Sequence, residues 1–278
     1  MSEALETHQK RQYEKLYQER FDAYGIPDRK ISETDLENHK LLSLGSGAGN
    51  DIWYLCDRNL VVGVDYARNG LVIGKQHGLH GILAELNFRT TLPFKNESFD
   101  IVICKDIFEH LLEPMAILRE VRRCLKNDGY IIISVPNHFY LPFRMRILFG
   151  KGLIWKSLCS DHQKDYDEWN YMHIRFFTFI GFVRFLSEAE FKPEKWFWDF
   201  GTLAHYQNPD MWLEPQLWKE SQGLPLSSRG KLGLRLIKPL WDLLNFIFPR
   251  PFRSFIVSIS PGVLCAGFYV RARKSNRS

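Results

Sequence analysis

Three glycines and one acidic residue form the part of this sequence whose types and spacing best suit chemistry. Gly45, Gly47 and Gly49 follow a short apolar run, and a second apolar run ends on Asp65. A glycine turn after one strand, with an acid at the tip of the next, is how a doubly wound α/β domain holds a nucleoside. The alternative is an ordinary glycine turn beside a surface acid. Because strand, turn, helix, strand and acid follow one another in order, the pattern favours a nucleoside site.

The spacing of the glycines narrows the class of ligand. A dinucleotide-binding turn has a third glycine, which packs helix on strand, at the position that Asn50 occupies in this chain. The turn also lacks the Lys-Ser/Thr pair of a phosphate-binding loop. We therefore expect neither a dinucleotide nor a nucleoside triphosphate here.

The elements that must position these residues alternate along the chain. Short apolar runs predict strands, and the amphipathic stretches between them predict helices. Strands are expected at 41–44, 60–64, 81–86, 99–104, 130–135, 193–200 and 264–274, and helices at 49–57, 67–77, 113–125 and 178–189. This alternation is typical of a parallel sheet with helices on both faces.

Two long segments interrupt the alternation. The domain is expected to span 40–274, preceded by an N-terminal helix and linker at 1–39. The insertion at 137–172 is rich in aromatic residues and is interpreted as a lid. The insertion at 201–262 is basic and amphipathic. We expect the two insertions together to form a cap.

Size and composition indicate one large globular domain. The 278 residues are 45% apolar and 25% charged, values that are ordinary for such proteins. The first twenty residues are charged and polar, so we expect no signal peptide and a cytoplasmic location. The five cysteines are scattered and lack C-x-x-C spacing. This favours reduced thiols over a disulfide framework.

Positive charge is concentrated near the C-terminus. Residues 221–278 hold ten Lys and Arg and one acid, a net charge of +9, whereas the remaining 27 basic and 31 acidic residues give −4. Arg235 and Lys238 fall at helical spacing among apolar residues, and Pro239 is expected to bend or split that stretch. We consider two interpretations of 231–253: a peripheral contact with an anionic membrane surface, or a plain cap over the substrate site. Nucleic acid is not expected, because the segment lacks a repeated stripe of phosphate-contacting residues.

Seven stretches of the chain match the motifs of one enzyme family. They lie at 42–49, 62–66, 92–100, 108–111, 125–129, 134–137 and 173–178, and include Val-Gly-Val-Asp-Tyr, Phe-Glu-His-Leu, Ser-Val-Pro-Asn and His-Ile-Arg-Phe-Phe-Thr. The sequence resembles the type-11 group of class I S-adenosylmethionine-dependent methyltransferases. That group contains ubiquinone and menaquinone methyltransferases and methionine-biosynthesis W-like proteins. The resemblance covers residues 40–200 and the last strand.

The resemblance implies a fold, a cofactor and an activity. The fold would be a doubly wound α/β domain with a mostly parallel, seven-stranded, Rossmann-like sheet whose last strand is antiparallel. The cofactor would be S-adenosylmethionine, and the product S-adenosylhomocysteine. The chain would be a methyltransferase with a small-molecule acceptor, which the resemblance does not name.

The resemblance also implies a site for the methyl donor. Its members would be Gly45, Ser46, Gly47, Asp65, Tyr66, Glu85, Leu86 and Lys105. Asp65 would hold both ribose hydroxyls through charge-assisted hydrogen bonds. Glu85 would accept from the adenine amino group, and the backbone carbonyl of Lys105 would lie by the sulfonium. One position departs from the family: Ser43 stands where an acid is usual, which removes a negative charge near the cationic amine of the donor.

Histidines are the candidates for a general base. Methyl transfer from a sulfonium depends mainly on alignment, so a base is needed only where the acceptor must lose a proton. Histidine titrates near neutrality, and His110, His138 and His173 fall at carboxyl ends of strands or in the lid. The alternative is that each caps a helix or bonds a backbone carbonyl.

The lid is expected to supply the acceptor pocket. Its aromatic side chains could wall an apolar or aromatic acceptor, or could only pack the insertion onto the sheet. The pocket candidates are Phe139, Tyr140, Phe143, Trp155 and Tyr171. No metal site is expected, because the acids and His162 between Asp161 and Glu168 are more typical of a solvated loop than of a ligand set.

Three functions remain open at the level of sequence. The first is a methyltransferase that acts on oxygen or nitrogen of a small apolar or aromatic acceptor. The second is a non-catalytic partner protein with this fold, which Ser43 and the lack of an obvious base favour. The third is a lipid or quinone methyltransferase docked at a membrane through 231–253.

Overall fold

The computed structural model describes residues 36–87, 91–150, 173–198, 225–247 and 249–275, together with the single positions Glu14, Gly152, Glu220 and Gly223. Of the helix expected at the N-terminus, only Glu14 is described, and it is helical. Most of the expected lid and the first part of the second insertion lie outside the described residues.

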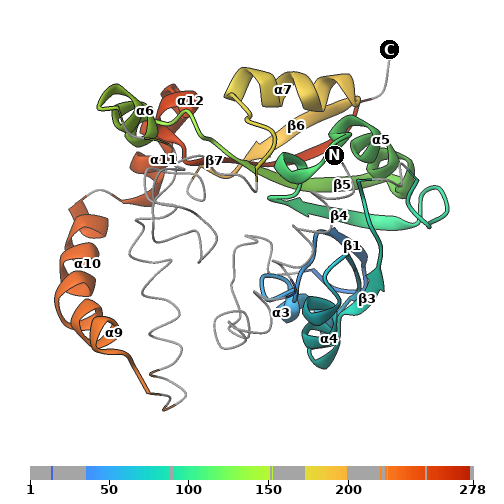
Figure 1. The fold of residues 1–278 in the computed structure, drawn as a ribbon, viewed down its shortest axis with the longest axis horizontal. Helices are drawn as coiled ribbons and strands as arrows, with labels where there is room; N and C mark the ends of the chain where they lie inside the picture. Colours follow the sequence, from blue (N-terminus) through green and yellow to red (C-terminus); the bar gives the residue numbers. More distant parts are fainter. Residues whose placement is uncertain are drawn as a thin grey trace.

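Seven strands form one sheet in the order β3-β2-β1-β4-β5-β7-β6 (Figure 1). The strands are β1 Lys40–Leu44, β2 Leu60–Asp65, β3 His80–Leu83, β4 Phe99–Lys105, β5 Leu125–Pro136, β6 Phe191–Trp196 and β7 Gly267–Lys274. Strands β1 to β5 pair in parallel, and β7 pairs antiparallel with β5 and β6. The predicted doubly wound, mostly parallel sheet with an antiparallel last strand is confirmed.

Helices cover both faces of this sheet. One face carries α5 (Pro114–Cys124) and α7 (Phe179–Glu188), and the other carries α3 (Trp53–Cys56) and α4 (Arg68–Gln76) (Figure 1). Neighbouring strand residues therefore enter different cores: Leu42 packs in the cluster that contains α5 and α7, and Leu41 packs in the cluster that contains α3. Because both faces are buried, the strands are continuous apolar runs.

The strand order reverses at β1, which lies between β2 and β4. The chain therefore builds outward in one direction through β2 and β3 and in the other through β4 and β5. In open α/β sheets the crevice beyond the carboxyl ends of the strands at such a point is where ligands bind. The glycine turn follows β1 at this place.

Some elements are shorter than predicted. The helix expected at 49–57 is reduced to α3, because turns occupy the segment before it, with Ile52 N donating to Gly49 O at 2.9 Å. β3 ends before residue 86 and β6 before residue 200. Both are edge strands with a single neighbour, so each has fewer ladder hydrogen bonds to extend it.

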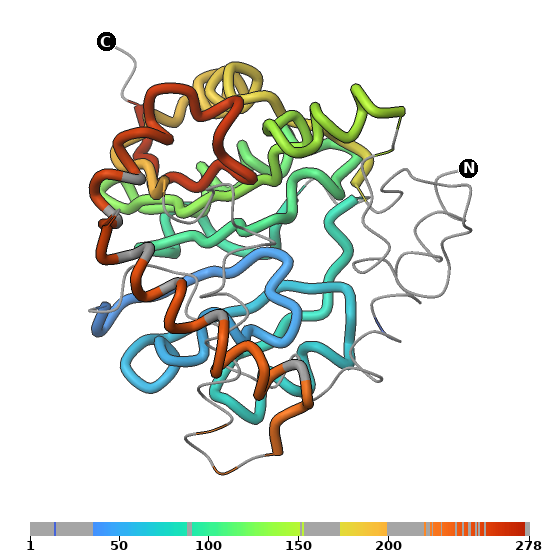
Figure 2. The backbone as a smooth tube through the Cα atoms, turned by 90° about the vertical axis from the view of Figure 1, so that its left-hand side faces the viewer, coloured from blue at the N-terminus to red at the C-terminus, as the bar shows by residue number. Residues whose placement is uncertain are grey.

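The two insertions contribute further helices to the structure. The lid insertion begins with α6 (Leu141–Leu148). The second insertion contains α9 (Ser228–Leu232), the π-helical turn η2 (Gly233–Ile237), α10 (Lys238–Ile247), α11 (Arg250–Ile259) and α12 (Pro261–Leu264). The π turn ends two residues before Pro239, which has no N–H to donate. Figures 1 and 2 show α9 and α10 along the outside of the molecule. Within the described ranges, no helix is long and apolar enough to cross a membrane.

Candidate active site

The glycine turn closes tightly over the end of β1. Gly45, Gly47 and Gly49 have positive φ angles of 64°, 52° and 73°. At Gly45 a Cβ atom would lie 2.7 Å from Cδ1 of Ile107, in the segment after β4. A side chain at Gly45 is therefore opposed both by the backbone conformation and by this close approach. The backbone N of Gly45 donates to Val64 O at 2.8 Å, which joins the turn to β2.

Asp65 lies at the end of β2, beside the turn, and is 7% exposed. Its Oδ2 accepts from Gly47 N at 2.7 Å, and its Oδ1 accepts from Ala67 N at 2.8 Å. Burial raises the pKa of this carboxyl above its ordinary value, and the backbone N–H groups oppose that shift. Each carboxylate oxygen is thereby fixed in place and keeps a second lone pair. Asp65 therefore shapes the turn and also offers two fixed acceptors to a ligand.

A shallow cleft opens beyond the ends of β1, β2, β3 and β4. The cleft is lined by Gly45, Asp65, Tyr66, Ala84, Glu85, Leu86, Asn87, Ile107, His110 and Leu111. Five of the eight residues predicted for the donor site are among them: Gly45, Asp65, Tyr66, Glu85 and Leu86.

Asn87, which sequence reasoning did not single out, joins two walls of the cleft. Its backbone N donates to Oε1 of Glu85 at 2.9 Å. Its side-chain Oδ1 accepts from Leu112 N at 2.8 Å. The segment after β3 is thus tied to the segment after β4, which fixes the width of the cleft between them.

Glu14 reaches the site from far along the chain. Its carboxylate accepts from Arg68 N at 2.7 Å and from Asn69 N at 2.9 Å. These N–H groups begin α4, and the N-cap residue, Ala67, has no side chain that could accept them. Glu14 therefore caps α4 and places a negative charge at the positive end of its dipole. A cap supplied by a distant segment leaves no local signal in the sequence, which is why the pattern did not reveal it.

Three further donor candidates lie around the turn. Lys105 ends β4, and its Nζ lies 3.0 Å from Oδ2 of Asp51 in a partly buried ion pair. This ion pair neutralises the ammonium of Lys105. The contact expected between its backbone carbonyl and the sulfonium of the donor stays a prediction. The Oγ of Ser46 is buried without a hydrogen-bond partner among the described residues. Ser43, the departure from the family, lies within β1 and is 5% exposed. Gly47 is the third of these candidates, and its backbone N donates a hydrogen bond to Oδ2 of Asp65.

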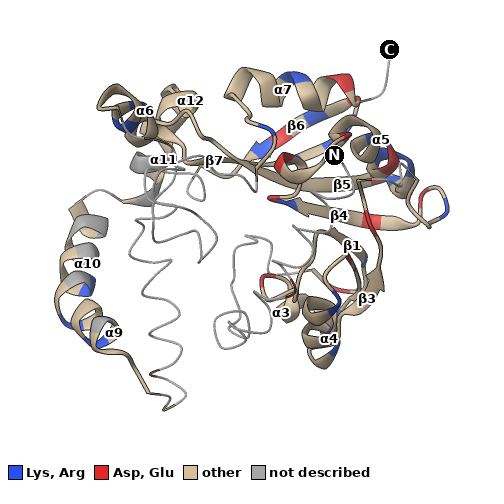
Figure 3. Ribbon diagram, viewed as in Figure 1, with Lys and Arg blue, Asp and Glu red and all other residues tan. Residues whose placement is uncertain are grey.

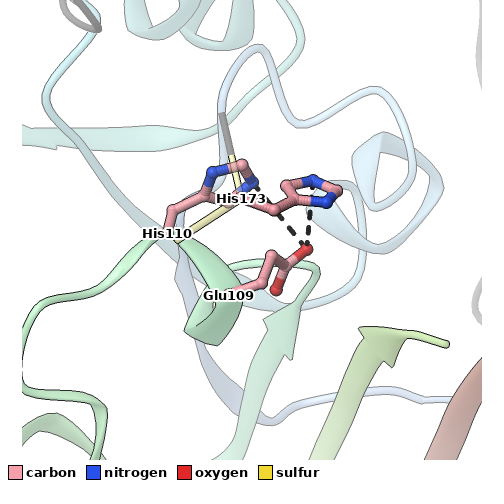
Figure 4. A group of neighbouring side chains, drawn as sticks. All are labelled: Glu109, His110 and His173. Atoms are coloured by element: carbon pink, nitrogen blue, oxygen red, sulfur yellow. Dashed lines mark ion pairs between the residues drawn. The ribbon is translucent and has the colours of Figure 1, made fainter. Parts of the chain in front are cut away.

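Two of the three candidate histidines, His110 and His173, lie beside Glu109 (Figure 4). Glu109 and His110 belong to the 3-10 turn η1 (Phe108–His110), whereas His173 comes from the segment before α7. Oε1 of Glu109 lies 3.7 Å from Nε2 of His110 and 3.9 Å from Nε2 of His173. His138 joins the group through a 2.8 Å contact between its Nε2 and Nδ1 of His173. The fold therefore assembles one cluster from three separate segments.

Glu109 is the member of this cluster that sequence reasoning missed. Its side chain is fully buried, and neither carboxyl oxygen has a hydrogen-bond partner within the described part of the chain. Burial, with the nearby charge of Asp106, raises the pKa of Glu109 well above its ordinary value. Such a carboxyl favours its protonated form. The only signal in the sequence was its place in the Phe-Glu-His-Leu motif.

The histidines differ in basicity and in access to the cleft. Burial, with a contribution from His110, lowers the pKa of His138 to about 4 and that of His173 to about 2. Both rings are therefore neutral at pH 7, and one donates a hydrogen bond to the other. Imidazoles of such low basicity are poorly matched to general-base catalysis at neutral pH. His110 is the one of the three that lines the cleft, so it is the one placed to meet an acceptor.

The same cluster contains a set of atoms that could hold a metal ion. One ligand atom from each of Glu109, His110 and His173 lies within 4.8 Å of the others. A carboxylate with two imidazoles is a donor set known from zinc and non-haem iron sites. The prediction that the chain has no metal site rested on residues 161–168, which lie outside the described residues. It stays a prediction.

The aromatic residues proposed for the acceptor pocket do not line the cleft where they are described. Tyr140 and Phe143 are 2% and 6% exposed and pack edge to face, with ring centroids 4.7 Å apart. They form a small buried cluster with Ala266. Phe139 is partly buried. Tyr140 and Phe143 are thus part of the packing between α6 and the sheet, because edge-to-face stacking buries the surface that a ligand would need. Trp155 and Tyr171 lie outside the described residues.

Comparison with known proteins shows what part of the chain resembles. Residues 42–133 match a family model described as a methyltransferase domain. Ubiquinone biosynthesis O-methyltransferase of Bartonella quintana is 28% identical over 133 residues, which are 45% of this chain and 52% of that protein. Human arsenite methyltransferase is 27% identical over 157 residues, which are 46% of this chain and 41% of that protein. The chain spans about half the length of the curated relatives it matches.

A solved structure extends the likeness beyond the matched segment. It is phosphoethanolamine N-methyltransferase 2 of Haemonchus contortus, in complex with phosphomonomethylethanolamine and S-adenosylhomocysteine. The TM-score is 0.51 at 13% identity, over 89% of this chain and 51% of that chain. At this identity the likeness concerns the fold alone.

Proposed function

We propose that this chain, whose residues 42–133 match a methyltransferase domain, is a class I S-adenosylmethionine-dependent methyltransferase that transfers a methyl group to a small acceptor. The observation that carries the proposal is the single cleft in which the glycine turn, Asp65 and Glu85 meet. S-adenosylhomocysteine is the expected second product.

The residues around the cleft suit this donor. Asp65 offers two fixed carboxylate oxygens, as a ribose diol requires. Tyr66, Glu85 and Leu86 lie in the same cleft, where the adenine would sit. When bound, the donor supplies an activated methyl group, so the chain needs mainly to align donor and acceptor.

On the acceptor side, we propose that His110 meets the substrate. It lines the cleft together with the apolar side chains of Ile107 and Leu111, which suits a small apolar or aromatic molecule with an oxygen or nitrogen nucleophile. His110 would take the proton of that nucleophile where one must leave. His138 and His173 would position His110 from behind, because their rings contact the same cluster and are neutral.

The test is a calorimetric titration of the full chain with S-adenosylhomocysteine. We expect micromolar binding, and Asp65→Ala should weaken it by about 100-fold, since two hydrogen bonds to a charged group are lost. Asp57→Ala removes an exposed acid at the C-terminal end of α3 and is the matched control. Thermal unfolding of both variants separates loss of the ligand from loss of the fold. Undiminished binding by Asp65→Ala would refute the assigned site.

A non-catalytic partner protein is the second candidate. Ser43 and the low basicity of His138 and His173 favour it. Formation of S-adenosylhomocysteine by the wild-type chain with a panel of phenols, amines and quinols distinguishes the two. Turnover lost in His110→Ala with donor binding intact supports the enzyme. Tight donor binding without turnover on any member of the panel supports the partner.

A further inference from the structure

Exposed apolar side chains gather in one part of the described structure, the segment 228–259, which we call the C-terminal arm. Ten of the 19 large apolar side chains that are exposed in the described ranges belong to it. They are Leu232, Leu236, Leu240, Leu243, Phe246, Ile247, Phe252, Phe255, Ile256 and Ile259. A concentration of this kind marks an interaction surface, whereas scattered single residues do not.

The apolar residues of the arm are arranged as continuous stripes. In α9, η2 and α10 they recur every three or four residues, so they share one side of the helix. Phe246 is the most exposed, at 84%. In α11, Phe252, Phe255 and Ile259 are exposed, whereas Val257 is buried in the main core. One side of α11 therefore holds the arm to the domain, and the other faces outward.

The arm runs along the outside of the molecule and ends near α6 (Figures 1 and 2). Asn137, just before α6, donates to the backbone O of Gly262 and of Cys265, so α6 and α12 are joined. At the end of α6, Leu148 and Phe149 are 73% and 71% exposed. Leu148 and Phe149 thus form a second exposed apolar pair, at the end of α6 that lies away from Asn137.

The charge of the arm indicates what covers its apolar side. Residues 228–259 contain six Lys and Arg and a single acid, Asp242. Oδ2 of Asp242 already lies 2.5 Å from Nζ of Lys238, in an ion pair. Lys231 and Arg235 are exposed and each directly precedes a Leu of the apolar stripe (Figure 3). Apolar side chains bordered by basic ones suit the boundary between acyl chains and anionic headgroups.

We propose that the C-terminal arm docks this protein on the surface of an anionic lipid bilayer. The arm lies flat, with its Leu, Ile and Phe side chains among the acyl chains and its Lys and Arg side chains at the lipid phosphates. It does not span the bilayer, because no described helix is long and apolar enough. The proposal is independent of methyl transfer: it concerns where the domain works and not what it methylates.

A second copy of the chain suits this surface less well. A two-fold interface would place the arm of one copy on the same residues of the other. The basic side chains would then face like charge, with one paired acid to offset six cations. Anionic lipid removes that repulsion.

The test is flotation of the full chain with vesicles. Wild-type protein should float with phosphatidylcholine vesicles that contain anionic phosphatidylglycerol, and should float much less with phosphatidylcholine alone or in high salt. Lys231→Glu with Arg235→Glu should lower the partition coefficient by about 25-fold or more, because each basic residue near an anionic surface contributes about fivefold. Leu240→Glu with Phe246→Glu should abolish flotation. Ile180→Glu, at a residue 65% exposed on α7, is the matched control and should float like the wild type.

Donor binding, measured on the same preparations, shows whether each variant is folded and keeps this test separate from the proposed function. Equal flotation of wild type and arm variants would overturn the proposal, as would failure of the wild type to float. A concentration-dependent dimer that Phe246→Glu dissociates, seen by sedimentation without lipid, would assign the surface to a second copy instead.

Discussion

The donor cleft and the C-terminal arm meet water in opposite ways. In the cleft, polar groups are buried and fixed: Asp65 is 7% exposed, and both of its oxygens are held by backbone N–H groups. In the arm, apolar groups are exposed, up to 84% at Phe246. A buried acceptor with a lone pair to spare suits a small ligand, and an exposed apolar stripe suits a large surface. The contrast teaches that one chain can carry a nearly preformed small-molecule site beside a surface that is complete only with a partner.

The largest expected effect contrasts a glycine of the cleft with one near the lid. Gly45 and Gly150 have similar positive φ angles, 64° and 69°, but a Cβ at Gly150 would meet nothing within 4 Å. Gly45→Ala should lower the free energy of unfolding by about 3–4 kcal/mol, the sum of backbone strain and overlap with Ile107. Gly150→Ala should cost only the strain, about 1–2 kcal/mol. Urea unfolding measures both.

Equal losses at the two glycines would show that strain alone governs them and that the turn is not tightly packed. Donor titration sharpens the comparison, because Gly45→Ala should also weaken binding and Gly150→Ala should leave it unchanged.

The second prediction concerns the pH dependence of stability at the lid side of the cleft. Folding lowers the pKa of His138 from its ordinary 6.5 to about 4, so the unfolded chain binds more protons between these values. The contribution of His138 to the free energy of unfolding is therefore fully present above pH 6.5 and is lost as the pH falls toward 4. The loss due to His138 should be about 3 kcal/mol at most. The measurement is the free energy of unfolding at pH 7, 6, 5 and 4.5, with a chelator present.

The control for this prediction is a substitution that removes the titration. His138→Gln should make the fall in stability between pH 6.5 and 4.5 shallower without abolishing it, because burial also lowers the pKa of His173, which still contributes. His80→Gln, at an exposed histidine on β3, should keep the wild-type slope. If both variants keep that slope, the buried pair does not govern the acid sensitivity.

The smallest expected effect concerns Glu14, and it tests whether the N-terminal segment supports the side of the donor cleft that α4 forms. Glu14→Gln removes the charge that caps α4 beside Asp65. We expect a loss of about 0.5–1 kcal/mol, or a fall in melting temperature of about 2–4 °C. Donor affinity should fall less than fivefold. Glu37→Gln, at an exposed acid paired with Arg58, is the matched control, and an equal fall in melting temperature there would argue against a specific role for the cap.

Sequence reasoning was most successful where function follows local order. The glycine spacing and the acid after the second strand need only neighbouring residues, and five of the eight donor candidates line one cleft. It was less successful where contacts are long range. Glu14, Asn87 and Glu109 act through partners in other segments, so no periodicity or spacing revealed them.

The aromatic candidates also show that sequence patterns do not reveal long-range contacts. Composition favoured a pocket wall at Tyr140 and Phe143, but residue type does not say whether a ring faces a ligand or another ring. Their edge-to-face packing decides that they belong to the core. Histidine type likewise suggested a base, whereas burial lowers the pKa of His138 and of His173 and so argues against that role, which stays a prediction.

The sequence by itself determined the order of strands and helices and the position of the glycine turn, because apolar periodicity and turn residues act over a few positions. The tertiary structure decided which of those residues share one cavity, which are neutralised and which face solvent. Burial changes the free energy of charged and apolar groups alike. That term depends on the packing of segments that are distant along the chain, and so it appears only once they have been brought together.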